Sequence, residues 1–269
     1  MKIAVIQINA PEDKEANVAK AFAFMEQAVR EGSPDLIVLP ENFTCYSTDA
    51  ALMARNAEAM PGGPTHEALS RFARAHKVNI HAGSMSEAGA DKPFNTSVVF
   101  DRTGREIARY RKIHRFDITA PDGTRYFESD VVGGGQDIVT YEIDGITFGC
   151  AICFDLRFGE LFRALVDRGA QAIVIPSAFT HATGEAHWEI LIRARAIECQ
   201  TYVIAPNQTG RFDNGSKANW GHSMIVDPWG RVLAQAEMEE GVIYAKIDAA
   251  EVARVRQRIP VAELRVLKS

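Results

Sequence analysis

The chain has 269 residues, of which 46% are hydrophobic and 24% charged, and these ordinary globular values exclude intrinsic disorder. Its net charge of −5 gives no basic field for phosphates, so we expect no nucleic-acid partner. We also expect no membrane attachment and no signal peptide, because no apolar run reaches a membrane span and the N-terminus lacks a small-residue cleavage site. The four cysteines do not form a disulfide framework in a chain this long, which favours the reducing cytoplasm.

The first half of the chain alternates predicted strands with predicted helices. Apolar residues spaced by four, three and four over 18–29 form the stripe of a helix, and Pro64 marks the start of another within 64–77. The run 36–40 is apolar throughout, as in strands that parallel sheets bury on both faces. The strands predicted in this half lie at 2–8, 36–40, 79–85, 95–101 and 105–111.

The second half repeats the alternation, with helices predicted at 157–168 and 185–199. Its predicted strands lie at 145–152, 172–175, 202–205, 223–226 and 242–247. Hairpins interrupt the strand–helix–strand rhythm, so we expect an α/β fold of two packed sheets with helices outside rather than one doubly wound sheet. No linker or low-complexity run divides the chain, which predicts one domain over 1–260 and a short tail at 261–269.

Three reactive side chains stand where predicted strands stop. Glu41 follows the strand at 36–40, Lys112 follows the strand at 105–111, and Cys153 ends the strand that begins near 145. Strand ends form the crevice in which α/β folds bind ligands. A carboxylate that removes the thiol proton and an ammonium that stabilises the thiolate would make Cys153 a nucleophile. The sequence distances alone leave open whether the three residues meet.

Three segments resemble the signature segments of the nitrilase (carbon–nitrogen hydrolase) superfamily and occur in the same order. They are 39–43 (LPENF), 110–114 (YRKIH) and 153–158 (CFDLRF). The similarity continues through the segments PSAF, AHWE, RARAIE, GHSM and VDPWG, and extends from residue 1 to about 260. A single short segment would be a weak signal, but the ordered set identifies the chain as resembling this superfamily.

The resemblance implies a four-layer αββα sandwich and a Glu-Lys-Cys triad at Glu41, Lys112 and Cys153. It further implies that Glu128 helps position Lys112 and the substrate. In this mechanism Glu41 acts as a base toward the thiol, and Cys153 attacks the substrate carbonyl. The Lys112 ammonium and the Phe154 backbone N–H stabilise the oxyanion, and water then hydrolyses the thioester. The mechanism needs no metal and no organic cofactor.

The same resemblance suggests which residues contact the substrate. Trp188, His187 and Phe179 are expected to line the pocket, with core packing as the alternative for Trp188. Glu189 is expected to brace Lys112, and His114 and His222 to orient backbone or line the pocket. Asp155 and Arg157 are expected to form an ion pair after the nucleophile. The details are closest to the branch containing deaminated-glutathione amidase and omega-amidase, which implies hydrolysis of a 2-oxo-acid amide that also bears a carboxylate. The cations proposed for that carboxylate are Arg157, Arg193 and Arg211.

Other interpretations remain beside this one. The same triad serves nitrile and N-carbamoyl hydrolysis, and a silent scaffold of the same fold is the non-enzyme alternative. Cys150 and Cys153 form a CxxC, but residues three apart in a strand face opposite sides, so a redox pair is disfavoured. A Cys-His-Glu amidotransferase is disfavoured by the bulky neighbours of Cys153. The histidines lack a zinc-binding spacing. The resemblance also implies a homodimer or higher assembly through the helices after Cys153 and near 185–199.

Overall fold

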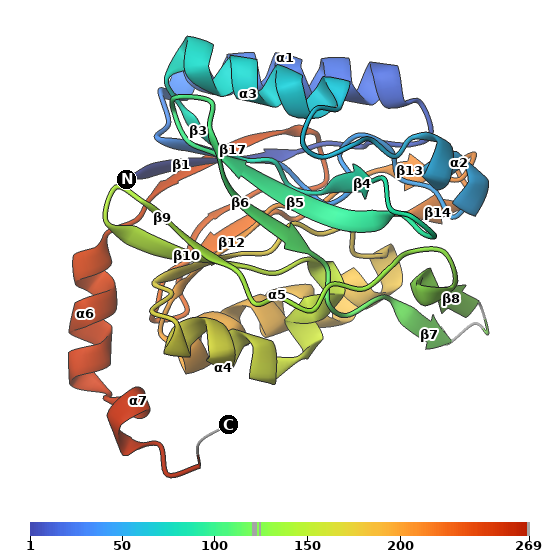
Figure 1. Cartoon of the computed structure of the whole chain (residues 1–269). Helices are drawn as coiled ribbons and strands as arrows, with labels where there is room; N and C mark the ends of the chain where they lie inside the picture. The colour runs from blue at the N-terminus through green and yellow to red at the C-terminus, as the bar shows by residue number, and fades with distance from the viewer. Residues whose placement is uncertain (120–122, 124, 268–269) are drawn as a thin grey trace.

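The computed structural model describes residues 1–119, 123 and 125–267. Two sheets pack face to face, and helices cover both outer faces (Figure 1). The first sheet has the strand order β17-β1-β2-β3-β5-β4, and β6 pairs with β5. Its strands are β1 (Lys2–Gln7), β2 (Leu36–Val38), β3 (Asn79–His81), β4 (Met85–Glu87), β5 (Phe94–Phe100), β6 (Glu106–Arg111) and β17 (Gly241–Lys246).

The second sheet has the order β16-β15-β12-β11-β10-β9. Its strands are β9 (Thr140–Ile143), β10 (Ile146–Cys150), β11 (Ala172–Val174), β12 (Tyr202–Ala205), β15 (Met224–Val226) and β16 (Val232–Gln235). Each sheet contains a parallel triplet, β1-β2-β3 in the first and β10-β11-β12 in the second. The carboxyl ends of parallel strands meet at one edge of a sheet, so the loops after β2, β10 and β11 can converge.

Helices α1 (Lys14–Gly32) and α3 (Pro64–His76) cover the first sheet, while α4 (Gly159–Asp167) and α5 (His181–Cys199) cover the second (Figure 1). The order of layers is therefore helix, sheet, sheet, helix, as expected. Pro64 is the first residue of α3, as its fixed φ favours. The chain ends in α6 (Ala249–Arg258) and α7 (Val261–Leu264), which extend beside the sandwich. Among the described helices none is long and apolar enough to cross a membrane.

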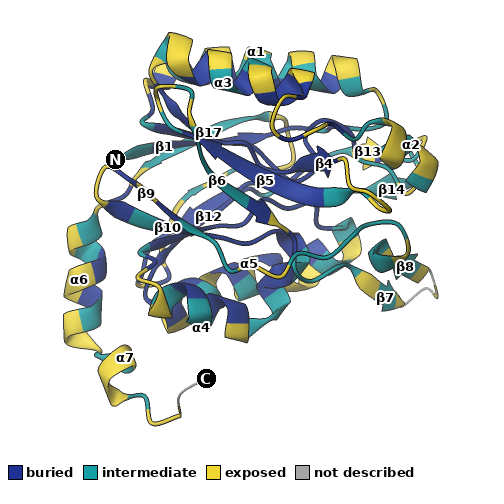
Figure 2. Ribbon diagram, viewed as in Figure 1, coloured by how far each residue is buried: buried dark blue, intermediate teal, exposed yellow. Residues whose placement is uncertain are grey.

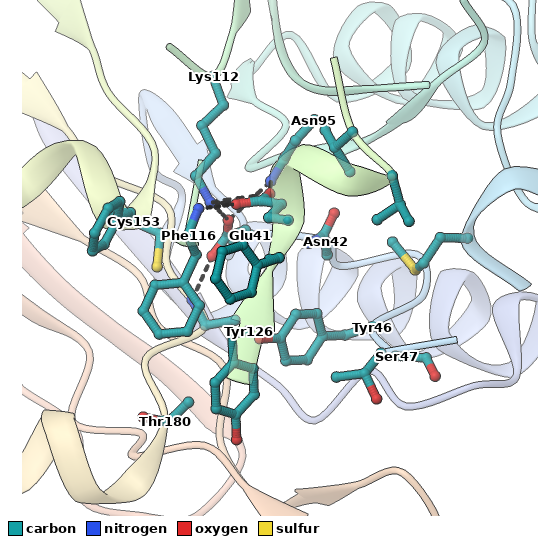
Figure 3. A pocket seen from close by; sticks show the side chains of 18 of the residues that line it. Glu41, Asn42, Tyr46, Ser47, Asn95, Lys112, Phe116, Tyr126, Cys153 and Thr180 are labelled. Carbon is teal, nitrogen blue, oxygen red and sulfur yellow. Dashed lines mark hydrogen bonds and ion pairs between the residues drawn. The ribbon is translucent and has the colours of Figure 1, made fainter. Parts of the chain in front are cut away.

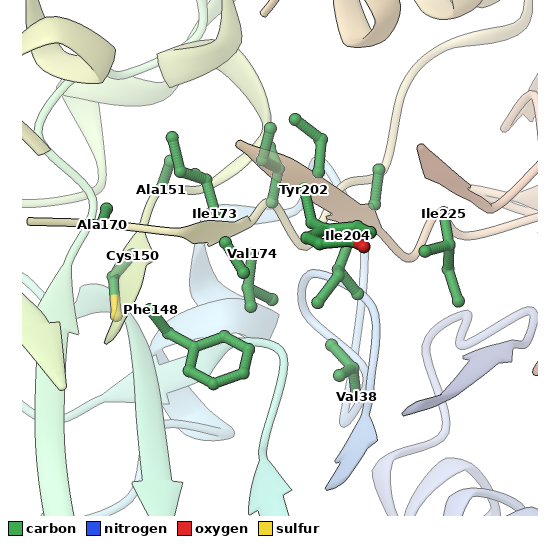
Figure 4. Close-up of a cluster of buried hydrophobic side chains, with 14 of the residues drawn as sticks. Val38, Phe148, Cys150, Ala151, Ala170, Ile173, Val174, Tyr202, Ile204 and Ile225 are labelled. Atoms are coloured by element: carbon green, nitrogen blue, oxygen red, sulfur yellow. The ribbon is translucent and has the colours of Figure 1, made fainter. Parts of the chain in front are cut away.

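The core has two parts because the central strands are buried on both faces (Figure 2). Along β1, Ile3 and Val5 point between the sheets, whereas Ala4 and Ile6 point toward α1 and α3. Figure 4 shows the inter-sheet part, where side chains from both sheets meet. Its members include Val38, Phe148, Val174, Ile204 and Ile225.

Helix α1 buries a stripe shifted from the one predicted, and Met25 is fully buried in both. The fully buried residues include Ala21 and Ala28, whereas Phe22 and Val29 of the predicted stripe are only half-buried. Gly32 explains the preference, because a Cβ there would come within 2.2 Å of the Tyr244 ring. Small residues let the helix lie close to the sheet, and the larger apolar residues pack along its sides.

Two strand predictions need correction. The segment predicted at 79–85 is two strands, because the chain turns at Gly83, which has a φ of 54° and whose Cβ would lie 2.1 Å from the Pro40 carbonyl oxygen. The strand predicted to end at Cys153 ends at Cys150. The sequence patterns also missed elements outside the two triplets. These are α2 (Ala50–Arg55), β9, β16, α6, α7 and the hairpins β7 (Asp117–Thr119)–β8 (Arg125–Phe127) and β13 (Arg211–Phe212)–β14 (Lys217–Ala218).

Candidate active site

Glu41, Lys112, Glu128 and Cys153 come together between the two sheets (Figure 3). Lys112 Nζ donates to Glu41 Oε1 at 2.9 Å and to Glu128 Oε2 at 2.9 Å. Lys112 is 2% exposed and Glu41 is 3% exposed, so this cluster of charges is almost fully desolvated. Burial opposes the charge on Lys112, but the Glu128 and Glu41 carboxylates outweigh it and hold its pKa well above the ordinary value.

The Glu41 carboxylate is fixed from three directions. Besides Lys112, it accepts hydrogen bonds from Asn95 Nδ2 at 2.9 Å and from the Ala178 N–H at 2.9 Å. Asn95 also accepts a backbone hydrogen bond from Lys112, so it links the acid to the segment that carries the lysine. Gln208 Nε2 donates to the Glu41 carbonyl oxygen at 2.8 Å. Sequence reasoning missed Asn95 and Gln208, because their contacts with Glu41 depend on strand pairing and loop packing.

Glu128 lies in a short 3₁₀ turn, η1 (Glu128–Asp130), directly after β8. Its Oε2 accepts a hydrogen bond from the Phe116 N–H at 2.6 Å in addition to the contact with Lys112. The side chain is 16% exposed and lines the cavity. It therefore lies where the resemblance placed it, beside Lys112 and facing the space open to a substrate.

Cys153 begins a 3₁₀ turn, η2 (Cys153–Arg157), and has a φ of 45°. A non-glycine residue in this left-handed region is strained, and such strain persists only where the surroundings fix the backbone. The Cys153 N–H donates to the Pro176 carbonyl at 2.9 Å, and the Asp155 N–H donates to the Ile152 carbonyl at 3.0 Å. The bulky neighbours Ile152 and Phe154, which were used against a Cys-His-Glu amidotransferase, do not prevent Cys153 from lying in a tight turn.

The surroundings of the Cys153 thiol favour its protonated form. Burial and the nearby Glu41 carboxylate raise its pKa well above the usual value, although the Lys112 ammonium and the Ala178 N–H act in the opposite direction. A thiol in this setting needs a base that acts when the substrate arrives, and Glu41 is the carboxylate beside it. The Phe154 N–H, which follows the thiol, makes no hydrogen bond to another described residue. It is therefore available to an oxyanion.

A cavity of about 400 Å³ opens beside these groups. Aromatic side chains line it together with a larger set of polar side chains, among them Glu41, Asn42, Ser47 and Thr180 (Figure 3). The aromatic residues are Tyr46, Phe94, Phe116, Tyr126, Phe127, Phe154 and Phe179. Aromatic walls with polar groups placed among them are typical of small-molecule sites. Of the predicted substrate contacts, Phe179 lines this cavity.

Trp188 and His187 do not line the cavity, so these two predictions are corrected. Trp188 is fully buried, its ring packs 4.9 Å behind Phe179, and its indole N–H donates to the His222 carbonyl at 2.8 Å. His187 is exposed on the outer side of α5, near Arg157. The AHWE segment lies on the first turns of α5, so only one of its faces approaches the loop that carries Phe179.

The predicted ion pairs around the site are also corrected. Glu189 is exposed and pairs with Arg193 rather than bracing Lys112. Asp155 does not pair with Arg157, because its carboxylate accepts from Tyr110 and His114 instead. The His114 ring therefore binds a carboxylate rather than backbone, the His222 ring contacts the Trp220 carbonyl at 2.8 Å as one of its two expected roles, and neither histidine lines the cavity.

The three arginines proposed for a substrate carboxylate lie in different places. Arg193 contacts Glu189 and the Gly230 carbonyl, and Arg211 donates to the Gly215 carbonyl, so both point away from the cavity. Arg157 is half-buried, with its guanidinium 5.6 Å from the Phe179 ring and 6.0 Å from the Phe154 ring. Burial lowers the pKa of Arg157, and the nearby Cys153 raises it. The sequence did not point to Lys217, which lines the cavity opening.

Cys45, Cys150, Cys153 and Cys199 are all buried free thiols. Cys150 lies in β10 and Cys153 lies beyond it, so the strand geometry used against a redox pair does not apply to these two residues. Within 1–119, 123 and 125–267, three or more His, Cys, Asp or Glu side chains are nowhere grouped as metal ligands would be.

Comparisons with known proteins agree with this geometry. A family model described as carbon-nitrogen hydrolase matches residues 2–257. The chain is 39% identical to omega-amidase NIT2 of Homo sapiens over 97% of this chain and 93% of that protein. It is 38% identical to a deaminated glutathione amidase of Synechocystis over 98% of this chain and 97% of that protein.

Solved structures of related proteins have the same fold. Nit3 of Saccharomyces cerevisiae, a member of branch 10 of the nitrilase superfamily, superposes with a TM-score of 0.89 at 34% identity and covers 99% of this chain and 97% of its own. The C. elegans NitFhit protein superposes with a TM-score of 0.91 at 35% identity, and the match covers 98% of this chain and 65% of NitFhit. The predicted nitrilase-like sandwich is confirmed.

Proposed function

The chain belongs to the carbon–nitrogen hydrolase family, and we propose that it hydrolyses the carboxamide of a 2-oxo-acid amide to a carboxylate and ammonia. The observation that carries the proposal is the desolvated contact of Lys112 with Glu41 and Glu128 beside the Cys153 thiol. A base, a cation and a thiol at one end of a cavity are the groups that acyl transfer to cysteine requires.

In the proposed reaction Glu41 takes the thiol proton as the Cys153 sulfur attacks the amide carbon. The new oxyanion receives hydrogen bonds from Lys112 Nζ and the Phe154 N–H, which are in place before the reaction and need no reorganisation. The C–N bond breaks as Glu41 returns the proton to the leaving ammonia, and a thioester to Cys153 remains. Glu41 then takes a proton from water, which attacks the thioester, releases the carboxylate product and restores the thiol.

Glu128 supports this cycle by keeping Lys112 charged and in place. It gives Lys112 a second carboxylate partner without occupying Glu41 Oε2, which accepts from the Ala178 N–H. Two carboxylates around one ammonium leave a net negative charge, which favours uptake of the thiol proton by the cluster over release of an unpaired thiolate.

The substrate class follows from the names of the relatives and from the position of Arg157. The two relatives described above are an omega-amidase and a deaminated glutathione amidase. The Arg157 guanidinium lies near Cys153 and within 6.0 Å of the Phe154 and Phe179 rings, which line the cavity, and it pairs with no carboxylate of the described residues. We propose that it attracts the carboxylate of a 2-oxo acid whose amide reaches the thiol. Nitrile and N-carbamoyl substrates are the alternatives with the same catalytic groups.

We further propose a homodimer formed through α4 and α5, in a cytoplasmic protein. Ile190 on α5 is 70% exposed and Ile197 is 52% exposed, and Trp229 is 48% exposed in the turn that contacts Ile197 through Gly230. Exposed large apolar side chains that lie near one another are typical of interaction surfaces. The four free thiols are compatible with a reducing compartment.

The test is ammonia release from 2-oxoglutaramate, deaminated glutathione, a simple aliphatic amide, a nitrile and an N-carbamoyl amino acid. Wild type is compared with Cys153→Ala and with Cys150→Ala, a matched control that removes another buried thiol three residues away in β10. We expect release from the 2-oxo amides by wild type and Cys150→Ala only. Release confined to the nitrile or carbamoyl compound would reject the substrate class, and full activity of Cys153→Ala would reject the mechanism.

A further inference from the structure

Asp155 is a fully buried carboxylate that contacts both segments that carry the lysine and the cysteine. Its Oδ2 accepts from the Tyr110 hydroxyl at 2.7 Å and from the Ile152 N–H at 2.8 Å. Its Oδ1 accepts from the His114 N–H at 3.0 Å and from His114 Nδ1 at 2.7 Å. An ionised carboxylate can only accept, so Nδ1 is the protonated nitrogen of the ring.

The partners of Asp155 bracket the two catalytic positions. Tyr110 and His114 lie two residues before and two residues after Lys112, and Ile152 lies one residue before Cys153. Tyr110 belongs to β6, and Lys112 directly follows that strand, so Asp155 binds the backbone segment that carries the lysine. One carboxylate therefore sets how far the backbone that carries the lysine lies from the backbone that carries the thiol.

The acceptor capacity of Asp155 is fully used. A carboxylate offers about four lone-pair sites, and four donors converge on this one. An asparagine has the same shape but only one acceptor oxygen, and its NH₂ group would face two donors. The His114 ring is further held by stacking on Phe158, with centroids 3.7 Å apart and planes within 6°. The group is a rigid connection rather than a solvated surface contact.

The connection through Asp155 also fixes the turn that holds the strained backbone of Cys153. The left-handed φ of 45° persists only if the turn is fixed on both sides. The Asp155 side chain binds the N–H of Ile152, and the Asp155 N–H binds the Ile152 carbonyl, so both polar groups of the preceding residue are taken by one residue of η2. Without the carboxylate, the turn and the segment of Lys112 would relax independently.

We infer that Asp155 is a positioning residue that holds the Cys153 thiol and the Lys112 ammonium in register through Tyr110 and His114. The inference rests on the proposed function, because it assigns Asp155 a role in that same site. Asp155 acts at a distance from the substrate, and the cavity lining does not include it. Its loss should therefore affect the rate of the chemical step more than substrate binding.

The experiment compares Asp155→Asn and Tyr110→Phe with Asp227→Asn. Asp227 is a matched control, because it is a buried aspartate that fixes a turn through the Trp229 and Arg231 N–H groups, away from the cavity. Three quantities are measured on each variant: the melting temperature, kcat and KM on the best amide substrate, and the rate of Cys153 alkylation by iodoacetamide across pH. Cys153→Ala gives the background from the other thiols.

We expect Asp155→Asn to lower kcat by about 100-fold, the cost of misplacing a catalytic group by about 1 Å, with KM nearly unchanged. Tyr110→Phe keeps the carboxylate and three of its donors, so a drop of about tenfold is expected. The pH profile of alkylation should shift in both variants, whereas Asp227→Asn should lose melting temperature without changing either readout.

The alkylation readout does not depend on which substrate the enzyme uses, so failure of the proposed substrate class would leave this test intact. If Asp155→Asn does not fold, Tyr110→Phe decides the matter. A Tyr110→Phe variant with the kcat and alkylation profile of wild type would overturn the inference. The inference would also be overturned if Asp155→Asn and Tyr110→Phe lost only as much kcat as Asp227→Asn does at the same melting temperature.

Discussion

Replacing Lys112 with methionine tests whether the charges of the site act as one unit. Methionine is similar in shape but removes the cation that Glu41 and Glu128 share. Both carboxylates bond to Nζ at 2.9 Å, so the bonded oxygens lie at most about twice that distance apart. At an effective dielectric constant of about 20, two negative charges at that separation repel by about 3 kcal/mol. Removing one partner of a buried ion pair typically lowers the free energy of unfolding by about 3–5 kcal/mol, which agrees with this value.

We therefore expect Lys112→Met to lower the free energy of unfolding by about 3 kcal/mol and the melting temperature by roughly 10 °C. Urea titration and thermal unfolding measure the two quantities. Loss of the cation that stabilises the oxyanion should also lower kcat by about 100-fold to 1,000-fold. Lys217→Met is the matched control, because Lys217 also lines the cavity and pairs with Asp213 but is 26% exposed. A pair with that exposure contributes about 0–1 kcal/mol.

The decisive variant is the double substitution Lys112→Met with Glu128→Gln. In wild type, Glu128→Gln removes a partner of Lys112 and should destabilise the protein. In the Lys112→Met background the same change removes one of two like charges, so it should restore stability. If Glu128→Gln has the same sign in both backgrounds, or if Lys112→Met is as stable as wild type, the electrostatic account of the site is refuted.

Two further predictions concern single side chains. Arg157→Met should raise KM for carboxylate-bearing amides by about tenfold to 100-fold, which corresponds to the loss of a charge-assisted hydrogen bond. The KM for an amide without a carboxylate should not change. Equal effects on both amides would contradict the assignment. Burial lowers the pKa of His81 to about 3, below its ordinary 6.5, so its contribution to stability is complete above 6.5 and declines as pH falls toward 3. In urea titrations below pH 6.5, this group should lower the free energy of unfolding of the wild type by up to about 1.4 kcal/mol for each pH unit. His81→Gln should remove this pH dependence, and an unchanged pH dependence in that variant would contradict the prediction.

The sequence predicted the central architecture because local signals and tertiary structure agree there. The apolar runs at 36–40 and 172–175 are β-branched, short and buried on both faces, and they became β2 and β11. Glu41 and Lys112 were singled out because each is a charged residue that directly follows a predicted strand. Strand ends are thus the positions at which a single sequence identifies a site.

Other features could not be predicted because they depend on neighbours that are far away in the chain. Nothing local distinguishes Trp188 as a core residue, and only the position of Phe179 in front of it decides the matter. The stripe that α1 buries is chosen by its fit to Tyr244, which lies on β17. The turn at Cys153 was read as strand because 145–152 continues the apolar pattern up to the nucleophile, whereas pairing with β11 stops at Cys150.

The fold determines the position of the proposed base, Glu41. Its carboxylate accepts hydrogen bonds from Asn95, Lys112 and Ala178, and its carbonyl is held by Gln208, which is 167 residues away in the chain. These contacts form only when both sheets are complete and packed, because the anchors come from segments beside β5, β6, β11 and β12. A carboxylate with all of its partners in place loses little entropy when it acts as a base, since its orientation was fixed during folding. If Glu41 is the base that we propose, the inter-sheet core that Figure 4 shows contributes to the rate as well as to stability, through the position of one buried acid.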